Sequence, residues 1–318
     1  MNSALDVGRQ SVSLSALWRR LRQTRGTRRS EIVWAYILIL PNIIGFVLFN
    51  LGPIVQAFAM MFTDWPLVRP PEFIGLDNFR RLIADELFRT ALGNTLFYVV
   101  IYVPLVAVFA FLLASFLDRR IRGISFFRTL FFMPSICMFV SIAIIWQWLL
   151  DPNLGYINYL LSQVGVKGPG WLSDRRWAMI SVIFMNVWRH AGYYSLIFLA
   201  GLQGVPPEYY EAAEIDGAGP LARMRNVTIP LIFPTTFFVL VMAFIEAFQL
   251  FGEAFVMTGG GPGYATTTLV FLIYRNAFQA FKMGYAALQA WVLFGIIFVV
   301  TLIQWRLGQE RGYGFEND

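Results

Sequence analysis

The chain has 318 residues, of which 58% are hydrophobic and only 14% are charged, whereas a soluble domain carries roughly 25% charged residues. Several apolar runs of about 20 residues exclude a soluble globular protein and predict a polytopic membrane protein. The net charge of +6 reflects arginines that cluster beside these runs, as in cytoplasmic loops, and does not indicate a nucleic-acid partner. The single cysteine, Cys137, excludes a disulfide framework, and the single histidine, His190, leaves little material for a metal site.

Residues 1–30 form an arginine-rich arm, which we predict to be cytoplasmic. The apolar run that follows the arm is long, and no convincing small-residue cleavage site accompanies it. We therefore predict an uncleaved first span rather than a signal peptide.

The apolar runs are continuous rather than alternating, and this predicts helices instead of barrel strands. We predict six membrane-spanning helices, at about Ile32–Phe62, Leu92–Leu117, Phe126–Leu150, Trp177–Leu202, Leu231–Val256 and Tyr285–Leu307. Pro41 and Pro53 should kink the first of them. The predicted organisation is an all-α protein with the arm at 1–30, a six-helix transmembrane domain at 31–308 and a cytoplasmic tail at 309–318.

Arginine is denser at the N-terminus and in the turn Asp118–Arg122 than in the intervening segments. The positive-inside rule therefore places both chain ends in the cytoplasm. Residues 63–90 are then external, and we predict a short helix at about Leu76–Ile83 that Asp77 caps. The same topology places the acidic stretch Glu208–Gly219 in the cytoplasm.

The stretch Glu208–Gly219 carries three glutamates at three-residue spacing after a proline pair. Proline suits the first turn of a helix, and acidic residues suit its N-terminal end. Gly217 interrupts this helix, and Pro220 begins a second one that runs to about Val227. Two short helices at an angle predict a rigid knob at the membrane surface, and a solvated loop is the alternative.

The residues of this stretch also match a family pattern. The motif Glu211-Ala212-Ala213-x-x-Asp216-Gly217-Ala218, followed by Val227-Thr228-Ile229-Pro230, resembles the cytoplasmic EAA loop of ATP-binding-cassette importer permeases. Ala222 and Met224 depart from the pattern, because many members have a larger polar residue and an aromatic residue there. A second motif, Phe255–Pro262 with Gly284-Tyr285-Ala286-Ala287, is similar to the carbohydrate subgroup of maltose and glycerol-phosphate type.

The resemblance implies a permease subunit of an ATP-driven importer in the cell inner membrane, forming half of the pathway for a sugar, oligosaccharide or polyol derivative. It implies no catalysis and no cofactor in this chain, since ATP and Mg bind a partner ATPase. The implied partners are an ATPase dimer, a second homologous permease, an extracytoplasmic binding protein and the bilayer. In such permeases the EAA loop, here at about 205–230, couples to the ATPase, which implies this role for Glu208, Glu211, Ala212, Ala213, Asp216, Gly217 and Ala218.

Two charged residues, Arg189 and Glu246, lie about halfway along predicted spans, where a charge costs roughly 2.5–3.5 kcal/mol or more. One interpretation is an ion pair between them, and the other is a polar pathway wall that binds sugar hydroxyls. Helical spacing predicts one shared face for Glu246, Gln249 and Glu253. The predicted pathway residues are Tyr98, Gln147, Asn186, Arg189, Tyr193, Glu246, Gln249 and Gln289, with ordinary packing as the alternative for the aromatic residues.

Other chemistries lack their residues. The loop Gly259–Gly263 has no Gly-Lys-Ser/Thr after it, so no phosphate-binding loop of the Walker A type is present. We predict no catalytic residue and no metal ligand. The alternative function is a secondary transporter driven by an ion gradient, although the sequence shows no clear inverted repeat or paired broken helices. A membrane-embedded enzyme would need a polar catalytic cluster near one membrane face, which we do not find.

Overall fold

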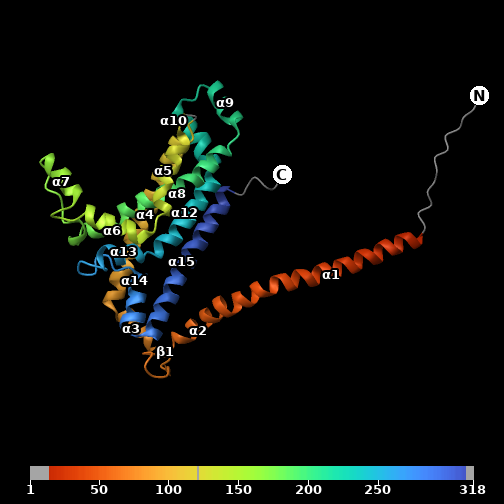
Figure 1. Ribbon diagram of the computed structural model, residues 1–318, viewed down its shortest axis with the longest axis horizontal. Coiled ribbons are helices and arrows are strands. Elements are labelled where there is room, and N and C mark those ends of the chain that lie inside the picture. The colour runs from red at the N-terminus through yellow and green to blue at the C-terminus, as the bar shows by residue number, and fades with distance from the viewer. Residues whose placement is uncertain (1–13, 120–121, 313–318) are drawn as a thin grey trace, which may run out of the picture. The chain divides into compact units, whose positions relative to one another are not determined.

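The computed structural model describes residues 14–119 and 122–312, with side chains over 30–119 and 122–308. The described chain is almost entirely helical (Figure 1). It divides into two compact units, Met1–Ala59 and Met60–Asp318. Most of the predicted arm and tail therefore lies outside the part whose side chains are described.

The described part of the first unit is one continuous helical run. Helix α1 (Leu14–Phe46) runs through a π-helical segment, η1 (Val47–Leu51), into α2 (Gly52–Met60). Proline has no backbone N–H to donate, and Pro53 lies two residues after the end of this π-helical segment. The stretch Ser30–Met60 is long and apolar enough to cross a membrane, as predicted for the first span, and none of its most apolar window is buried within the chain.

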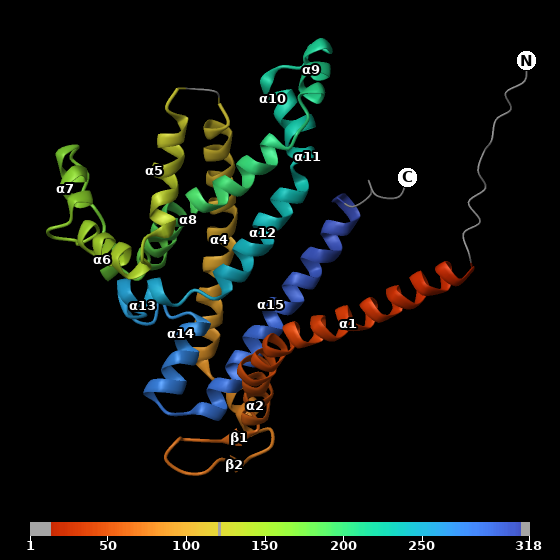
Figure 2. The ribbon, with the colours of Figure 1, turned by 45° about the vertical axis from the view of Figure 1, so that its right-hand side comes forward.

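The second unit is built on α4 (Glu86–Leu117) and α8 (Ala178–Gln203), which pack together, with α12 (Phe233–Phe248) beside them and α15 (Met283–Gly312) against α12 (Figure 2). Fully buried alanines on α4, Ala91, Ala110 and Ala114, allow close approach of the neighbouring helices. Larger side chains such as Tyr102 and Phe198 fill the space between them.

Two of the predicted spans are broken, so their prediction as continuous helices is wrong. The third consists of α5 (Ile124–Ile136) and α6 (Phe139–Leu149), which are bent by 96° at Cys137 and Met138. In the fifth, α12 ends at Phe248 and α13 (Gly252–Thr258) begins after three non-helical residues. Helix α11 (Ile229–Leu231) ends the segment before α12, and the two are bent by 68°. Broken helices, which we did not expect from the sequence, are therefore present.

Three helices in the described residues, Ser30–Met60, Glu86–Leu117 and Met283–Gly308, are long and apolar enough to cross a membrane, or up to five if each bent pair is one span. Helix α8 is not among them, although it has 26 residues. It carries Asn186, Arg189 and His190 in its middle, which lowers its hydropathy. The count of six spans stays a prediction.

Short elements cover the end of the second unit that lies opposite α9 (Figures 1 and 2). Strands β1 (Thr63–Asp64) and β2 (Glu72–Phe73) pair antiparallel, and α3 (Asp77–Ala84) follows. Asp77 does not cap α3, which corrects our prediction, because Leu76 occupies the N-cap position and Asp77 pairs with Arg80. The helix that an aspartate caps is α4, since the Asp85 carboxylate accepts hydrogen bonds from two backbone amides in its first turn.

The other connections also contain short helices. These are α7 (Tyr156–Gln163) and η2 (Trp171–Ser173) between α6 and α8, and α14 (Leu269–Tyr274) with the π-helical η4 (Arg275–Gln279) before α15. Asn94 on α4 donates to the carbonyls of Tyr264 and Thr267 at 2.7 and 2.9 Å. The glycine-rich segment before α14 is thereby held against α4.

Candidate functional site

The acidic stretch forms two short helices, as predicted. Helix α9 (Pro207–Ile215) has a proline in its first turn and Asp216 as its C-cap, and α10 (Pro220–Arg223) continues as the π-helical η3 (Met224–Thr228). Gly217 between them has φ +76°, a left-handed conformation that glycine adopts without strain. The angle between the helices therefore depends on this residue.

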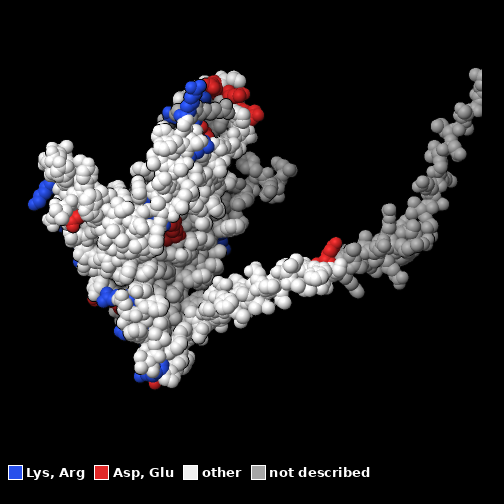
Figure 3. Space-filling view, viewed as in Figure 1, with Lys and Arg blue, Asp and Glu red and all other residues white. Residues whose placement is uncertain are grey.

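The knob formed by α9 and α10 is exposed but internally tied. The Tyr210 hydroxyl lies 3.2 Å from that of Thr228, and Arg223 lies 3.5 Å from Glu214. The predicted coupling residues Glu208, Glu211, Ala212, Asp216 and Gly217 are exposed, and Ala213 and Ala218 are half-buried. Acidic and basic side chains gather at this end of the molecule (Figure 3). The knob is thus an exposed, charged surface that is held together by internal contacts.

A second polar region lies where the broken helices meet the middle of α8. The Ser135 hydroxyl, at the end of α5, donates to the Arg189 carbonyl at 2.6 Å. A Cβ on Gly192 would collide with the backbone carbonyl of Phe131, and one on Gly252 would collide with the ring of Phe139. Close approach at these glycines brings both helix breaks beside Arg189.

The ion pairs in this region differ from the predicted one. Arg189 Nη1 lies 2.9 Å from Glu253 Oε1, and Glu246 Oε1 lies 2.9 Å from His190 Nε2. Tyr194 donates to Glu246 Oε2 at 2.6 Å. The interpretation of Arg189 and Glu246 as a direct ion pair is therefore wrong. The prediction that Glu246, Gln249 and Glu253 share one helical face is also wrong, because the chain leaves the helix after Phe248 and Glu253 belongs to a separate helix.

His190 is the site residue that sequence reasoning missed. Its Nδ1 lies 3.1 Å from both the Tyr102 hydroxyl and the Asn186 carbonyl oxygen, and its Nε2 lies 3.1 Å from Arg189 Nη1. Tyr98 stacks on Tyr102 with a centroid separation of 5.0 Å. A lone histidine next to a charged residue in mid-span is a usable signal, since buried polar groups in membranes need partners.

The predicted pathway residues divide by exposure. Tyr193, Glu246 and Gln249 are exposed, whereas Tyr98, Asn186 and Gln289 are buried. Gln289 accepts from Asn276 at 2.8 Å, and Gln147 donates to the carbonyls of Val256 and Met257. Gln147 and Gln289 thus make contacts that tie neighbouring elements together.

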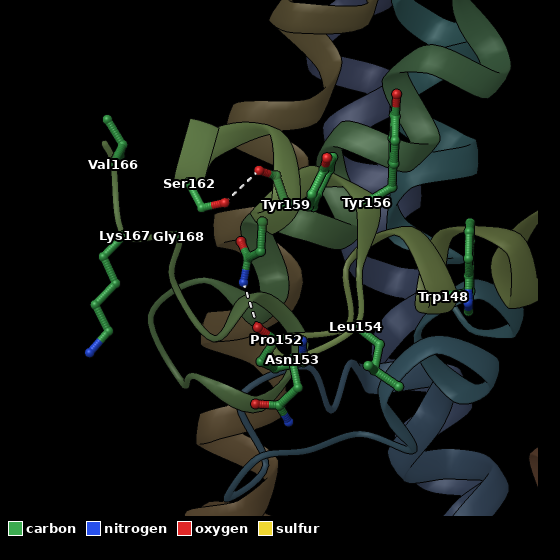
Figure 4. A pocket seen from close by; sticks show the side chains of 11 residues that line it. Trp148, Pro152, Asn153, Leu154, Tyr156, Tyr159, Ser162, Val166, Lys167 and Gly168 are labelled. Atoms are coloured by element: carbon green, nitrogen blue, oxygen red, sulfur yellow. Dashed lines mark hydrogen bonds between the residues drawn. The ribbon is translucent and has the colours of Figure 1, made fainter. Parts of the chain in front are cut away.

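Two recesses lie near the α6–α8 connection. One, of about 580 Å³, is lined by Trp148, Tyr156 and Tyr159 among others, and Lys167 extends away from these aromatic rings (Figure 4). Asn158 and Pro152 also line it, and Asn158 donates to the Pro152 carbonyl. The other, of about 520 Å³, is lined by Gln147 and by the end of α13. Among the described residues, no group of three or more His, Cys, Asp or Glu is placed to hold a metal ion.

Residues 122–310 match the family described as the binding-protein-dependent transport system inner membrane component. The chain is 38% identical over 288 residues to the probable ABC transporter permease protein YesP of Bacillus subtilis (strain 168), covering 89% of this chain and 92% of YesP. It is 34% identical over 281 residues to the sn-glycerol-3-phosphate transport system permease protein UgpA of Yersinia pestis, covering 87% of this chain and 94% of UgpA.

The fold is similar to a chain of a bacterial ABC transporter involved in the import of the acidic polysaccharide alginate, with a TM-score of 0.79, 24% identity and coverage of 92% and 99%. Fold and sequence together define a multi-pass permease of the inner membrane. The chain belongs to the family of inner membrane components of binding-protein-dependent transport systems. It is a transport subunit, and a separate partner hydrolyses ATP. Family membership does not favour the ion-gradient alternative.

Proposed function

We propose that this permease forms half of the pathway for a sugar, oligosaccharide or polyol derivative that an extracytoplasmic binding protein delivers. The observation that carries the proposal is that Tyr193, Glu246 and Gln249 are exposed, with Glu246 and Gln249 at the break that ends α12 and Tyr193 next to Tyr194, which donates to Glu246. Aromatic faces next to carboxylate and amide acceptors suit sugar hydroxyls. The names of relatives support this substrate class, since UgpA is a glycerol-phosphate permease and the similar fold belongs to an alginate importer.

The proposed topology has six spans, with α8 as the span that hydropathy alone does not identify, and with both chain ends in the cytoplasm. The transmembrane domain then covers residues 31–308, between the arm 1–30 and the tail 309–318. Helices α9 and α10 form the cytoplasmic EAA coupling loop at about 205–230. Their position opposite β1 and β2 in the second unit supports this assignment (Figure 2).

The proposed partners are a cytoplasmic ATPase dimer, a second homologous permease and the binding protein. ATP and Mg bind the ATPase, and this chain binds no cofactor. The chain path supports mechanical coupling, since α9 follows α8, which carries Arg189 and His190. Beyond the knob, η3 and α11 lead into α12, which carries Glu246. A movement of the knob therefore acts on both helices that hold the polar group.

Gly217→Pro tests the coupling proposal. Proline locks φ near −65°, which is incompatible with the observed +76°, and it removes the amide that donates to the Glu214 carbonyl at 3.0 Å. We expect ATP-driven uptake to be abolished in proteoliposomes while the protein still inserts.

Gly219→Ala is the matched control, because Gly219 has φ −69° and nothing lies within 4 Å of an added Cβ. Uptake by this variant should stay near the wild-type rate. Normal uptake by Gly217→Pro would contradict the coupling role of the knob.

A further inference from the structure

The four ionisable side chains of the mid-helix group are unequally exposed. Arg189 and Glu253 are each 15% exposed and neutralise each other, and His190 is 12% exposed. The Glu246 side chain is 43% exposed. The group therefore presents the Glu246 carboxylate outward, while Arg189 and His190 are held inside.

An exposed carboxylate in the middle of a span cannot face hydrocarbon without a large cost. Glu246 therefore faces water or another protein chain. Along α12 it follows the exposed Phe238 and Met242 at four-residue spacing, and the exposed Gln249 comes just after the helix ends. Acidic atoms are visible in the otherwise almost uncharged middle of the helical body (Figure 3).

The Glu246 carboxylate is also fixed in place. His190 contacts Oε1 at 2.9 Å and Tyr194 donates to Oε2 at 2.6 Å, and each oxygen keeps a further lone pair. A carboxylate held from behind by two side chains is a preorganised acceptor for a hydroxyl or ammonium group. The same carboxylate repels a ligand carboxylate or phosphate.

We propose that Glu246 sets the charge selectivity of the pathway, so that this permease carries neutral or cationic carbohydrates and rejects uronates and sugar phosphates. The proposal rests on the proposed function and narrows its substrate class. Arg189 does not offset the effect, because its guanidinium is already paired with Glu253. The chain would then differ in cargo charge from the alginate importer that shares its fold.

The test uses the complete transporter in proteoliposomes. The melting temperature of the binding protein is first measured with neutral sugars, amino sugars, uronic acids and sugar phosphates. The compound that raises it is the solute whose initial uptake rate is then measured. We expect a neutral or cationic solute. Glu246→Gln keeps the shape and removes the charge, and it should lower uptake at least about tenfold, whereas Glu246→Asp should retain more uptake than Glu246→Gln.

Glu72→Gln is the control, since Glu72 is exposed in β2, outside the polar group, and uptake should stay within about twofold of wild type. If the Glu246→Gln protein does not accumulate in the membrane, Tyr194→Phe is used in its place. This variant lacks the hydroxyl that donates to the Glu246 carboxylate, and its uptake should be lower by about threefold or more. The proposal is overturned if the transported solute is anionic, or if Glu246→Gln or Tyr194→Phe transports at the wild-type rate. It is also overturned if Glu246→Asp transports less than Glu246→Gln. Loss of the second permease from the purified Glu246→Gln complex would overturn it too, because Glu246 would then serve subunit contact. A solute that is not a carbohydrate refutes the proposed function, and its charge still decides the selectivity.

Discussion

At the scale of single residues, Arg189 and Glu253 form the most enclosed ion pair of the described chain. Removing one member of a buried pair leaves the other charge without compensation, at a cost of about 3–5 kcal/mol. Arg189→Met should therefore lower the stability of the purified protein by about this amount, measured by denaturant unfolding in detergent. The double variant Arg189→Met/Glu253→Gln should recover most of the loss, and a double variant no more stable than the single one would contradict the pairing.

Gly192 offers a second residue-scale prediction. An added Cβ would meet the Phe131 backbone carbonyl, which cannot rotate away as a side chain can. Gly192→Ala should destabilise the contact between α5 and α8 by about 1–3 kcal/mol in the same unfolding measurement.

The matched glycine is Gly295, which lies within α15 and has nothing within 4 Å of an added Cβ. Gly295→Ala should be neutral or stabilising by about 0.5–1 kcal/mol, because alanine favours the helical backbone. Equal effects of the two substitutions would show that α5 and α8 do not approach as closely as described.

At the scale of elements, Thr95 joins α4 to the start of α14. Its hydroxyl donates to the Ala91 carbonyl and accepts from the Leu269 amide at 2.9 Å, and the side chain is fully buried. Thr95→Val leaves that buried amide without a partner, which costs about 1–3 kcal/mol. We expect a corresponding loss of stability and faster hydrogen exchange at Leu269.

Thr90 is the matched control on the same helix. Its hydroxyl donates to the Glu86 carbonyl in the same four-residue pattern, but at an exposed position. Thr90→Val should change stability by no more than about 0.5 kcal/mol. A similar loss in both variants would indicate a general effect of valine in α4 rather than the loss of the Leu269 hydrogen bond.

The elements also show where sequence reasoning succeeds. Proline pairs and glycine act locally on the backbone, so the two helices of the knob and the break at Gly217 could be predicted. The interruptions at Cys137–Met138 and Gln249–Phe251 were not predicted, because hydropathy averaged over a whole span does not register a local break. Neighbouring helices make these breaks tolerable, through contacts such as that of Gln147 with Val256.

At the scale of the whole molecule, the proposed topology predicts opposite labelling of two exposed positions. Val166 lies before α8 and Ile215 lies in the knob after it. In a background with the free Cys137 replaced by alanine, Val166→Cys should react with an impermeant maleimide added to intact cells. Ile215→Cys should react only after the membrane is opened.

The control for this experiment is the cysteine-free protein, which should not be labelled under either condition. Labelling of both cysteines from the same side would mean that α8 does not cross the membrane. The six-span arrangement would then be wrong, even though the family assignment, which rests on sequence similarity, would stand.

The sequence by itself determined the membrane class, the helical character, the knob and the resemblance to importer permeases, because each follows from local composition or a contiguous motif. Only the tertiary structure decided which charges pair. Arg189 meets Glu253 rather than Glu246, and His190 and Tyr194 hold Glu246, because helix breaks change which face each acid occupies. Ion pairing depends on distances between side chains on different helices, and helical spacing within one segment does not contain those distances.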